Sequence, residues 1–193
     1  MRPAAAVVMF CLWPGLASAS QYSSVYTAFD LAACRQIEAG DGFMYDGTWA
    51  CKGYKDIDIV IASADARNFV AFGKDGMKHC AYRQTFTPLN DALSPVEWRL
   101  KDGKPIAAIE RWRMVVDENG NTATWLVVSA LRSGNSCHMH YVAGSFPQAN
   151  AAARQAADSL AEGFNCETGT ATVQSTAAPP PKLFFSCEEL AKQ

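Results

Sequence analysis

Between residues 96 and 143, apolar and polar positions alternate in four segments that are separated by strong turn signals. The turns lie at 101–104, which contains Asp102-Gly103, at 117–121, which contains Asn119-Gly120, and at 133–135. Asp-Gly and Asn-Gly are preferred in hairpins because both central positions of a tight turn need a positive φ. The alternation therefore predicts a four-stranded antiparallel meander.

Other segments extend this prediction on both sides. Residues 57–63, 68–72 and 80–86 are typical of further strands of a sheet with six or seven strands in all, and 46–51 also reads as a strand. Asp30 is placed to open a short helix that contains Cys34. Apolar residues at helical spacing predict a second helix from about Pro147 to Gly163, which are a typical start and stop.

One face of the meander carries most of its large apolar side chains. A two-residue turn at Asn119-Gly120 would place Glu110 opposite Ser129 and would gather on this face Ile106, Ala108, Trp112, Met114, Val116, Ala123, Trp125, Val127 and Leu131. We expect the late helix to cover this core face with its small side chains, and Glu110 to lie at the solvated rim. The predicted fold class is α+β: an antiparallel β-sheet meander with helices packed on one face, braced by disulfides.

The start of the chain has the pattern of a secretory signal peptide. A basic Met1-Arg2 precedes an apolar run at 4–13 and the small residues of 17–19, and the run is too short to span a membrane. The expected organisation is a signal peptide at 1–19, one α+β domain at 20–170, an Ala/Pro-rich linker at 171–182, and a C-terminal tail at 183–193 tied back to the domain. The predicted location is the periplasm or the extracellular space.

The cysteines are expected to form disulfides, because secretion exposes them to an oxidising environment. Of the seven cysteines, Cys11 falls inside the predicted signal peptide. The other six allow 15 pairings. A strand starting at Cys137 and a helix returning before Cys166 would bring these two together, since the two elements have similar lengths.

The same argument of a helix followed by a strand pairs the first two cysteines of the mature chain, and elimination leaves the last pair. The predicted disulfides are Cys34–Cys51, Cys137–Cys166 and Cys80–Cys187. The third would hold the tail, where Ser186 and Glu189 have capping-box spacing, against the domain.

Composition excludes some partners and offers no catalytic motif. The formal net charge of −2 provides no excess of basic residues for a nucleic-acid backbone. Neither a Gly-x-Ser-x-Gly nor a His-Glu-x-x-His motif occurs, so we assign no catalytic residue and expect no cofactor. A hydrolase with an unrecognised site and a structural envelope protein remain alternatives.

The candidate ligand-binding residues are Arg111, Arg113, His138 and His140, which the alternation places on the face opposite the core. Guanidinium groups match carboxylate or phosphate geometry, so this face could bind an anion. Ordinary pairing with acidic residues of neighbouring strands is the alternative. A three-residue turn at 133–135 directs both histidines to this face, whereas a two-residue turn reverses them; we favour the former because Met139 and Tyr141 suit the core.

The pair His138-x-His140 also has the spacing of two metal ligands on one side of a strand. Zinc requires at least three protein ligands, and His79 is expected in a distant turn. Two arginines on the same face would repel a dication. We therefore expect no metal site.

Several short runs in the sequence resemble those of a group of uncharacterised bacterial periplasmic proteins. They are Glu97-Trp98-Arg99-Leu100, Asp102-Gly103, Pro105, Ile109, Arg111-Trp112, Leu126-Val127-Val128, Cys137-His138, Tyr141-Val142, Ala149-Asn150, Ala153-Arg154, Ala156-Ala157-Asp158 and Phe164-x-Cys166. The resemblance covers about 30–166 and implies secretion and one shared fold, with no known activity. Cys80 and the tail from 177 onward are additions to the shared pattern.

Taken together, these features favour a secreted or periplasmic binding or inhibitor-type module. Its partner would be an envelope protein or a cell-wall component. No transmembrane segment is expected, and no feature of the sequence indicates an oligomeric state.

Overall fold

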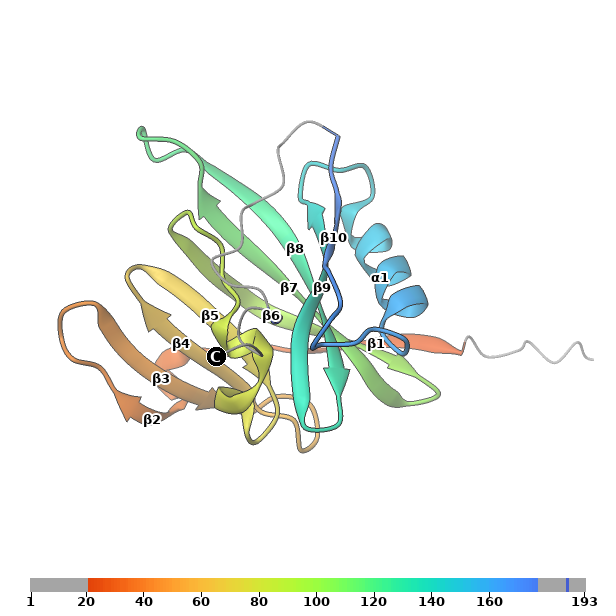
Figure 1. Cartoon of the computed structure of the whole chain (residues 1–193), viewed down its shortest axis with the longest axis horizontal. Coiled ribbons are helices and arrows are strands. Elements are labelled where there is room, and N and C mark those ends of the chain that lie inside the picture. The colour runs from red at the N-terminus through yellow and green to blue at the C-terminus, as the bar shows by residue number, and fades with distance from the viewer. Residues whose placement is uncertain (1–20, 177–186, 188–193) are drawn as a thin grey trace, which may run out of the picture.

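The computed structural model describes residues 21–176 and Cys187. Within these residues the chain forms two largely antiparallel β-sheets and one α-helix, which are stacked as three layers (Figure 1). The predicted signal peptide at 1–19, the end of the linker and the tail other than Cys187, with its predicted cap at Ser186 and Glu189, lie outside the described residues. No helix in the described part of the chain is long and apolar enough to cross a bilayer.

The larger sheet, sheet A, contains the predicted meander as four consecutive strands. Its strand order is β1-β6-β7-β8-β9-β10, and all pairs are antiparallel except β9 with β10. The bounds are β1 Tyr22–Thr27, β6 Asn90–Lys101, β7 Lys104–Val115, β8 Thr122–Arg132, β9 Asn135–Ala143 and β10 Thr172–Gln174. The edge strand β10 lies in the range that the sequence assigns to the linker.

A second sheet, sheet B, lies across one face of sheet A, where the sequence predicts extra strands of a single sheet. Its order is β2-β3-β4-β5, with bounds Arg35–Ala39, Tyr45–Cys51, Ile59–Ala64 and Arg67–Phe72. Three short 3₁₀ helices complete the fold: η1 Leu31–Ala33, η2 Gly76–Lys78 and η3 Cys80–Arg83. The helix predicted at Asp30 is the single turn η1, capped by the Asp30 carboxylate.

The predicted strand at 80–86 is wrong. The amides of Tyr82 and Gln84 donate to carbonyls three residues earlier, at His79 and Ala81, as in a 3₁₀ turn. The Cys80 amide donates to Asn135 Oδ1 at 2.9 Å. These local bonds and the side-chain contact satisfy the main chain that a strand would have used in a sheet ladder.

The core between the two sheets contains the face that the sequence predicts to be buried. Trp112 lies opposite Trp125, and both are at most 3% exposed. Val127, Met114 and Ala108 join them in one cluster with residues of β4 and β5, among them Ile61 and Val70. Two residues of the predicted face lie elsewhere. Ile106 packs against the cluster on the opposite face of sheet A, and Val116 lies beyond the end of β7 and is 55% exposed.

The helix covers the opposite face of sheet A, which corrects the prediction that it packs on the tryptophan face. Helix α1, Ala149–Leu160, buries its alanines against Ile109, Leu126 and Val128. Ala153 and Ala157 are both fully buried. The tryptophan face is already occupied by sheet B, and the other face is apolar enough at its centre to form a second core. Sheet A is therefore the middle layer (Figure 1).

The turn between β7 and β8 is longer than predicted, but the faces are the same. The Val116 amide donates to the Asn121 carbonyl, so the turn spans 117–120. Glu110 consequently lies opposite Val127 rather than Ser129. A shift of two residues preserves the alternation of side chains, which is why the predicted core face is still correct.

All three predicted disulfides are present. Cys34–Cys51 ties η1 to β3, and Cys137–Cys166 ties β9 to the segment that follows α1. Cys80–Cys187 ties η3 to the tail. The Cα–Cα distances are 4.6, 5.6 and 5.6 Å for Cys34–Cys51, Cys137–Cys166 and Cys80–Cys187. Because such bonds persist in oxidising compartments, they indicate an extracytoplasmic environment.

Candidate functional site

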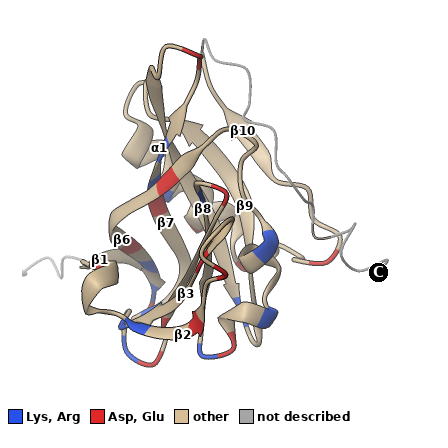
Figure 2. Cartoon of the chain, turned by 90° about the vertical axis from the view of Figure 1, so that its left-hand side faces the viewer, with Lys and Arg blue, Asp and Glu red and all other residues tan. Residues whose placement is uncertain are grey.

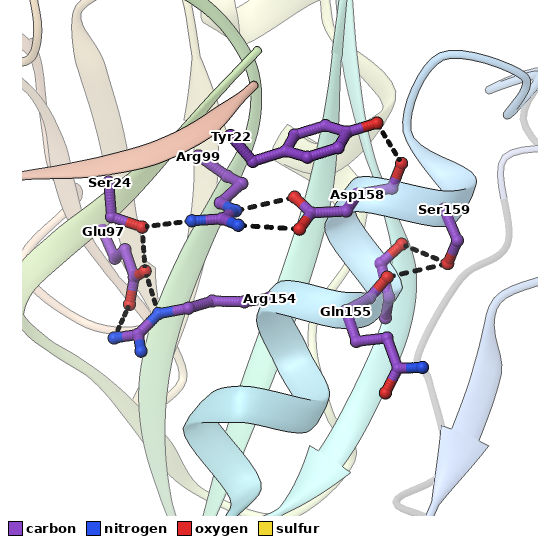
Figure 3. A network of polar contacts seen from close by, with 9 residues as sticks. Tyr22, Ser24, Glu97, Arg99, Arg154, Gln155, Asp158 and Ser159 are labelled. Atoms are coloured by element: carbon purple, nitrogen blue, oxygen red, sulfur yellow. Dashed lines mark hydrogen bonds and ion pairs between the residues drawn. The ribbon is translucent and has the colours of Figure 1, made fainter. Parts of the chain in front are cut away.

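A network of charged side chains joins β6 to the outer layer formed by α1 (Figure 3). Glu97 accepts hydrogen bonds from Arg154 Nε at 2.5 Å and from Ser24 Oγ at 2.6 Å, both on Oε1. Arg154 also donates to Glu97 Oε2 at 3.2 Å and to the Tyr26 hydroxyl at 2.8 Å. The Glu97 carboxylate is therefore held by β1 and by α1 at once.

The second half of the network is an arginine–aspartate pair one step along the strand. Arg99 binds Asp158 with two parallel hydrogen bonds of 2.6 and 2.7 Å, and donates to Ser24 Oγ at 3.0 Å. Glu97 and Arg99 share a face because they are two residues apart on β6, while Arg154 and Asp158 are one helical turn apart. Complementary charges on a strand and a helix thus fix the orientation of α1.

The network is balanced in charge. Burial disfavours ionised Glu97, but its hydrogen bonds to Arg154 and Ser24 outweigh burial, so the pKa of Glu97 lies below its usual value. The hydrogen bond to Asp158 raises the pKa of Arg99, and the bond to Glu97 raises the pKa of Arg154. Glu97 and both arginines are therefore charged at neutral pH, and the ion pairs Arg154–Glu97 and Arg99–Asp158 balance the charges of the network.

A pocket of about 250 Å³ opens beside this network. It forms where β6 separates from β7: Leu93 pairs with Arg111 and Glu97 pairs with Ile109, so β6 has two extra residues there. The wall combines polar groups with apolar side chains, and the lining is formed by Tyr26, Leu93, Ser94, Pro95, Glu97, Ile109, Arg111, Leu126, Asn150 and Arg154.

Arg111 is the unbalanced charge of this pocket. Its Nη2 donates to Asn150 Oδ1 at 3.0 Å, on the first turn of α1. Among the residues that the structure describes, Arg111 forms no ion pair, whereas Arg154 is engaged by Glu97. The pocket therefore carries a net positive charge and a guanidinium that is free to bind an anion.

The other predicted binding residues do not join Arg111 in this pocket. Arg113 forms an exposed ion pair with Asp91, at 2.7 Å, which is the ordinary cross-strand pairing considered for this face. His138 is 1% exposed in the core between the sheets, where its ring lies edge-on to Trp112. His140 is 8% exposed and hydrogen-bonds to Thr172 of β10 at 2.6 Å.

The two histidines point to different faces because β9 contains a bulge. Ser129 pairs with His138 but Val128 pairs with His140, so Met139 is an extra residue. The turn before it has two residues, since Arg132 pairs with Asn135. The prediction of a three-residue turn with both histidines on the arginine face is therefore wrong. Tyr141 is buried in the core between the sheets as expected, whereas Met139 is buried in the second core beneath α1.

Burial has strong effects on the groups of this inner core. It lowers the pKa of His138 to about 3, so the ring is neutral. Glu110 is 1% exposed, which corrects its expected place at the solvated rim, and burial raises its pKa to about 8. Trp112 Nε1 donates to Glu110 Oε2 at 3.1 Å, the only hydrogen bond found for this carboxyl group in the described residues.

The structure also brings His79 to Ser136, a pair that the sequence did not suggest. Ser136 Oγ lies 3.2 Å from His79 Nδ1 and accepts the Phe72 amide at 3.1 Å. Ser136 is completely buried, so its hydroxyl is not available to a substrate in this conformation. The pair connects β5, η3 and β9, and offers no accessible nucleophile for the hydrolase alternative.

Charged residues of both signs are interspersed around the molecule (Figure 2). No group of three or more potential metal ligands occurs in the portion described by the structure. The sequence placed Arg111 among the candidate binding residues, and it did not suggest that Glu97, Arg99 and Asp158 form a unit. The signal was present as Glu-x-Arg on a strand and Arg-x-x-x-Asp on a helix, two patterns of opposite order that can pair.

Comparison with protein families, with curated proteins and with solved structures found no match to this chain.

Proposed function

We propose that the protein is a periplasmic or secreted binding module that holds a negatively charged group of an envelope protein or cell-wall component through Arg111. The three disulfides support a location outside the cytoplasm. The resemblance to periplasmic proteins supports the same location, and we propose that the chain belongs with that group.

The observation that carries this proposal is the state of Arg111. Its guanidinium lines a pocket, is oriented by Asn150, and has no acidic partner among residues 21–176 and 187. A guanidinium presents several N–H donors in a planar fork that matches carboxylate or phosphate. The charges of the neighbouring Arg154 and Glu97 cancel in their ion pair, so they do not repel an incoming anion.

The experiment is a titration of the isotope-labelled mature protein with acetate and, separately, inorganic phosphate, followed by NMR. We expect saturable shifts of the Arg111 Nε–H and the Asn150 side-chain amide. Arg111→Gln should abolish these shifts, and added salt should weaken them. Shifts that are absent, or that persist unchanged at Asn150 in Arg111→Gln, would contradict the proposal.

Two matched variants control for unspecific effects. Arg113→Gln removes the same charge from the same face, two residues away, and should bind like the unmodified protein. Phe43→Ser changes the most exposed large apolar side chain of the described residues, 89% exposed at the β2–β3 turn of sheet B, and should also bind normally. Loss of binding in either control would remove Arg111 as the explanation.

A further inference from the structure

We infer that the pocket lined by Arg111 and Asn150 binds the C-terminal residue of a peptide chain. The terminal carboxylate would bind Arg111, and an apolar side chain would contact the apolar residues of the lining. The inference rests on the proposed function, because it names the ligand of the same anion site. The occupant is defined by two features together: a terminal carboxylate, and an aliphatic side chain on the same carbon.

Two of the polar side chains that line the pocket, Arg111 and Asn150, suit a carboxylate. Arg111 offers the N–H groups that Asn150 does not occupy. Asn150 uses its Oδ1 to accept from Arg111, which leaves its amide Nδ2 as a donor. A carboxylate has two oxygens and can accept from both side chains at once. Both donors are held in place before binding, which lowers the entropic cost of binding.

The lining also contains four apolar residues. Ile109 and Leu126 are nearly buried, at 4% and 3% exposed, and Leu93 and Pro95 lie where β6 separates from β7. An aliphatic side chain placed here removes apolar surface from water on both partners. A phosphate or a bare acetate would leave this wall unused.

The size of the pocket indicates a single residue. Pockets that enclose a whole small-molecule ligand usually have at least about 300 Å³. This one has about 250 Å³, enough for one terminal residue while the rest of the chain stays outside. Tyr26 lines the pocket and is 56% exposed, so the preceding residues of the peptide can leave along this side chain.

The same site disfavours a free amino acid. An α-ammonium group would need a carboxylate, and Glu97 is the only one in the lining. Glu97 Oε1 already accepts from Arg154 and Ser24, and Oε2 accepts from Arg154. The charge of Glu97 is thus already balanced by Arg154, so an ammonium group would lose its hydration without gaining an unbalanced carboxylate, whereas the acylated nitrogen of a peptide carries no such charge.

The test is calorimetric titration of the full mature chain with short synthetic peptides. The probes are N-acetyl-Ala-Ala-Leu as the free acid, the same peptide as its C-terminal amide, N-acetyl-Ala-Ala-Gly as the free acid, and free leucine. We expect the leucine-terminated acid to bind at least about tenfold more tightly than each of the other three. The amide lacks the charged hydrogen bond to Arg111, and the glycine peptide lacks the apolar contact. Free leucine has a charged ammonium group in place of the neutral peptide nitrogen.

The outcomes separate this inference from the proposed function. Equal binding of the leucine and glycine acids, with loss in Arg111→Gln, would overturn the peptide inference and leave the anion site intact. Equal binding of acid and amide would overturn both. Tight binding of free leucine would also overturn the inference, since the ligand would then be the amino acid itself.

Variants locate the binding without depending on one substitution. Arg111→Gln should lower the affinity for the leucine-terminated acid to the affinity for its amide. Leu93→Ser should reduce the preference for the leucine-terminated over the glycine-terminated acid. Arg113→Gln should retain both properties. The comparison of acid with amide needs no variant at all, so it decides the question even if a substituted chain fails to fold.

Discussion

Glu110 and His138 are two titratable side chains in the same inner core, and folding shifts their pKa values in opposite directions. Burial raises the pKa of Glu110 to about 8 and lowers the pKa of His138 to about 3. In the unfolded chain the pKa values of Glu110 and His138 are about 4.3 and about 6.5, respectively. Both side chains are consequently neutral in the folded protein around pH 6, and ionising either one opposes folding.

The pH dependence of stability follows from these two shifts. As pH rises from about 4.3 to about 8, unfolded Glu110 has lost its proton while folded Glu110 keeps it, so stability falls. As pH falls from about 6.5 to about 3, His138 becomes protonated in the unfolded chain but stays neutral in the folded protein, so stability falls in that direction too. The two effects offset between about 4.3 and about 6.5, and Glu110 dominates between about 6.5 and about 8.

We therefore predict that stability decreases from about pH 6.5 to about pH 8 by up to about 1.4 kcal/mol per pH unit. Glu110→Gln should flatten this limb, because glutamine can still accept from Trp112 and does not ionise. Urea unfolding at several pH values measures both proteins. A limb that is equally steep in Glu110→Gln would show that another group is responsible.

At this scale the sequence predicted Arg111 as a binding residue because strand alternation is preserved along β7. It did not predict the partners of Arg111 or the faces of sheet A on which the two histidines lie. The extra residue Met139 reverses the face to which the preceding side chains of β9 point, and nothing local in the sequence marks that bulge. Asn150 reaches Arg111 only after α1 has docked, which is a tertiary event.

Among the elements, α1 approaches sheet A closely because the residues it buries are alanines. Ala149, Ala153, Ala156 and Ala157 form its buried face. These small side chains allow the helix to pack closely against Leu126 and Val128, and the close packing brings Arg154 within hydrogen-bonding distance of Glu97. Close packing of α1 thus supports both the second core and the walls of the pocket.

Ala153→Leu should destabilise the protein by about 1 to 3 kcal/mol, because the added methyl groups have no space against β8 and β9. Ala151→Leu adds the same atoms on the exposed face of the same helix and should have little effect. Denaturant unfolding gives both values. Equal effects of the two substitutions would mean that α1 is not held tightly against sheet A.

The four strands of the meander could be predicted because each of its turns has a local signal, but the lengths of two turns and the covering of its two faces could not. β8 contains the nearly continuous apolar run from Trp125 to Leu131, which is typical of a strand buried on both sides. That run was the available sign of a second core under α1. The separation of β2–β5 into another sheet left no comparable local signal.

The whole molecule is a three-layer stack fastened by disulfides, each of which joins separate elements. Cys137–Cys166 closes a sequence separation of 29 residues and links the middle layer to the end of the helical layer. Cys137–Cys166 could be predicted because strand and helix lengths limit where the chain can return, and Cys80–Cys187 was predicted only by elimination. The relative placement of the three layers depends on contacts between residues distant in sequence.

Replacing Cys137 and Cys166 together by alanine should lower the free energy of unfolding by roughly 3 to 4 kcal/mol, from the loop that the bond closes. The α1 network around Arg99 and Glu97 should remain formed in the folded state, since it does not involve these cysteines. Urea unfolding of the oxidised double variant provides the measurement. Unchanged stability would indicate that the unfolded chain is already restricted there.

The three-layer arrangement also determines what an optical experiment on this protein reports. Trp98, Trp112 and Trp125 all belong to the core between the two sheets, and the described part of α1 contains no tryptophan. Their fluorescence therefore responds when sheet B separates from sheet A and is largely silent to movement of α1. A helix that lifted from the opposite face would escape detection by emission spectra, and following it would need a dye attached to an exposed position such as Ala151.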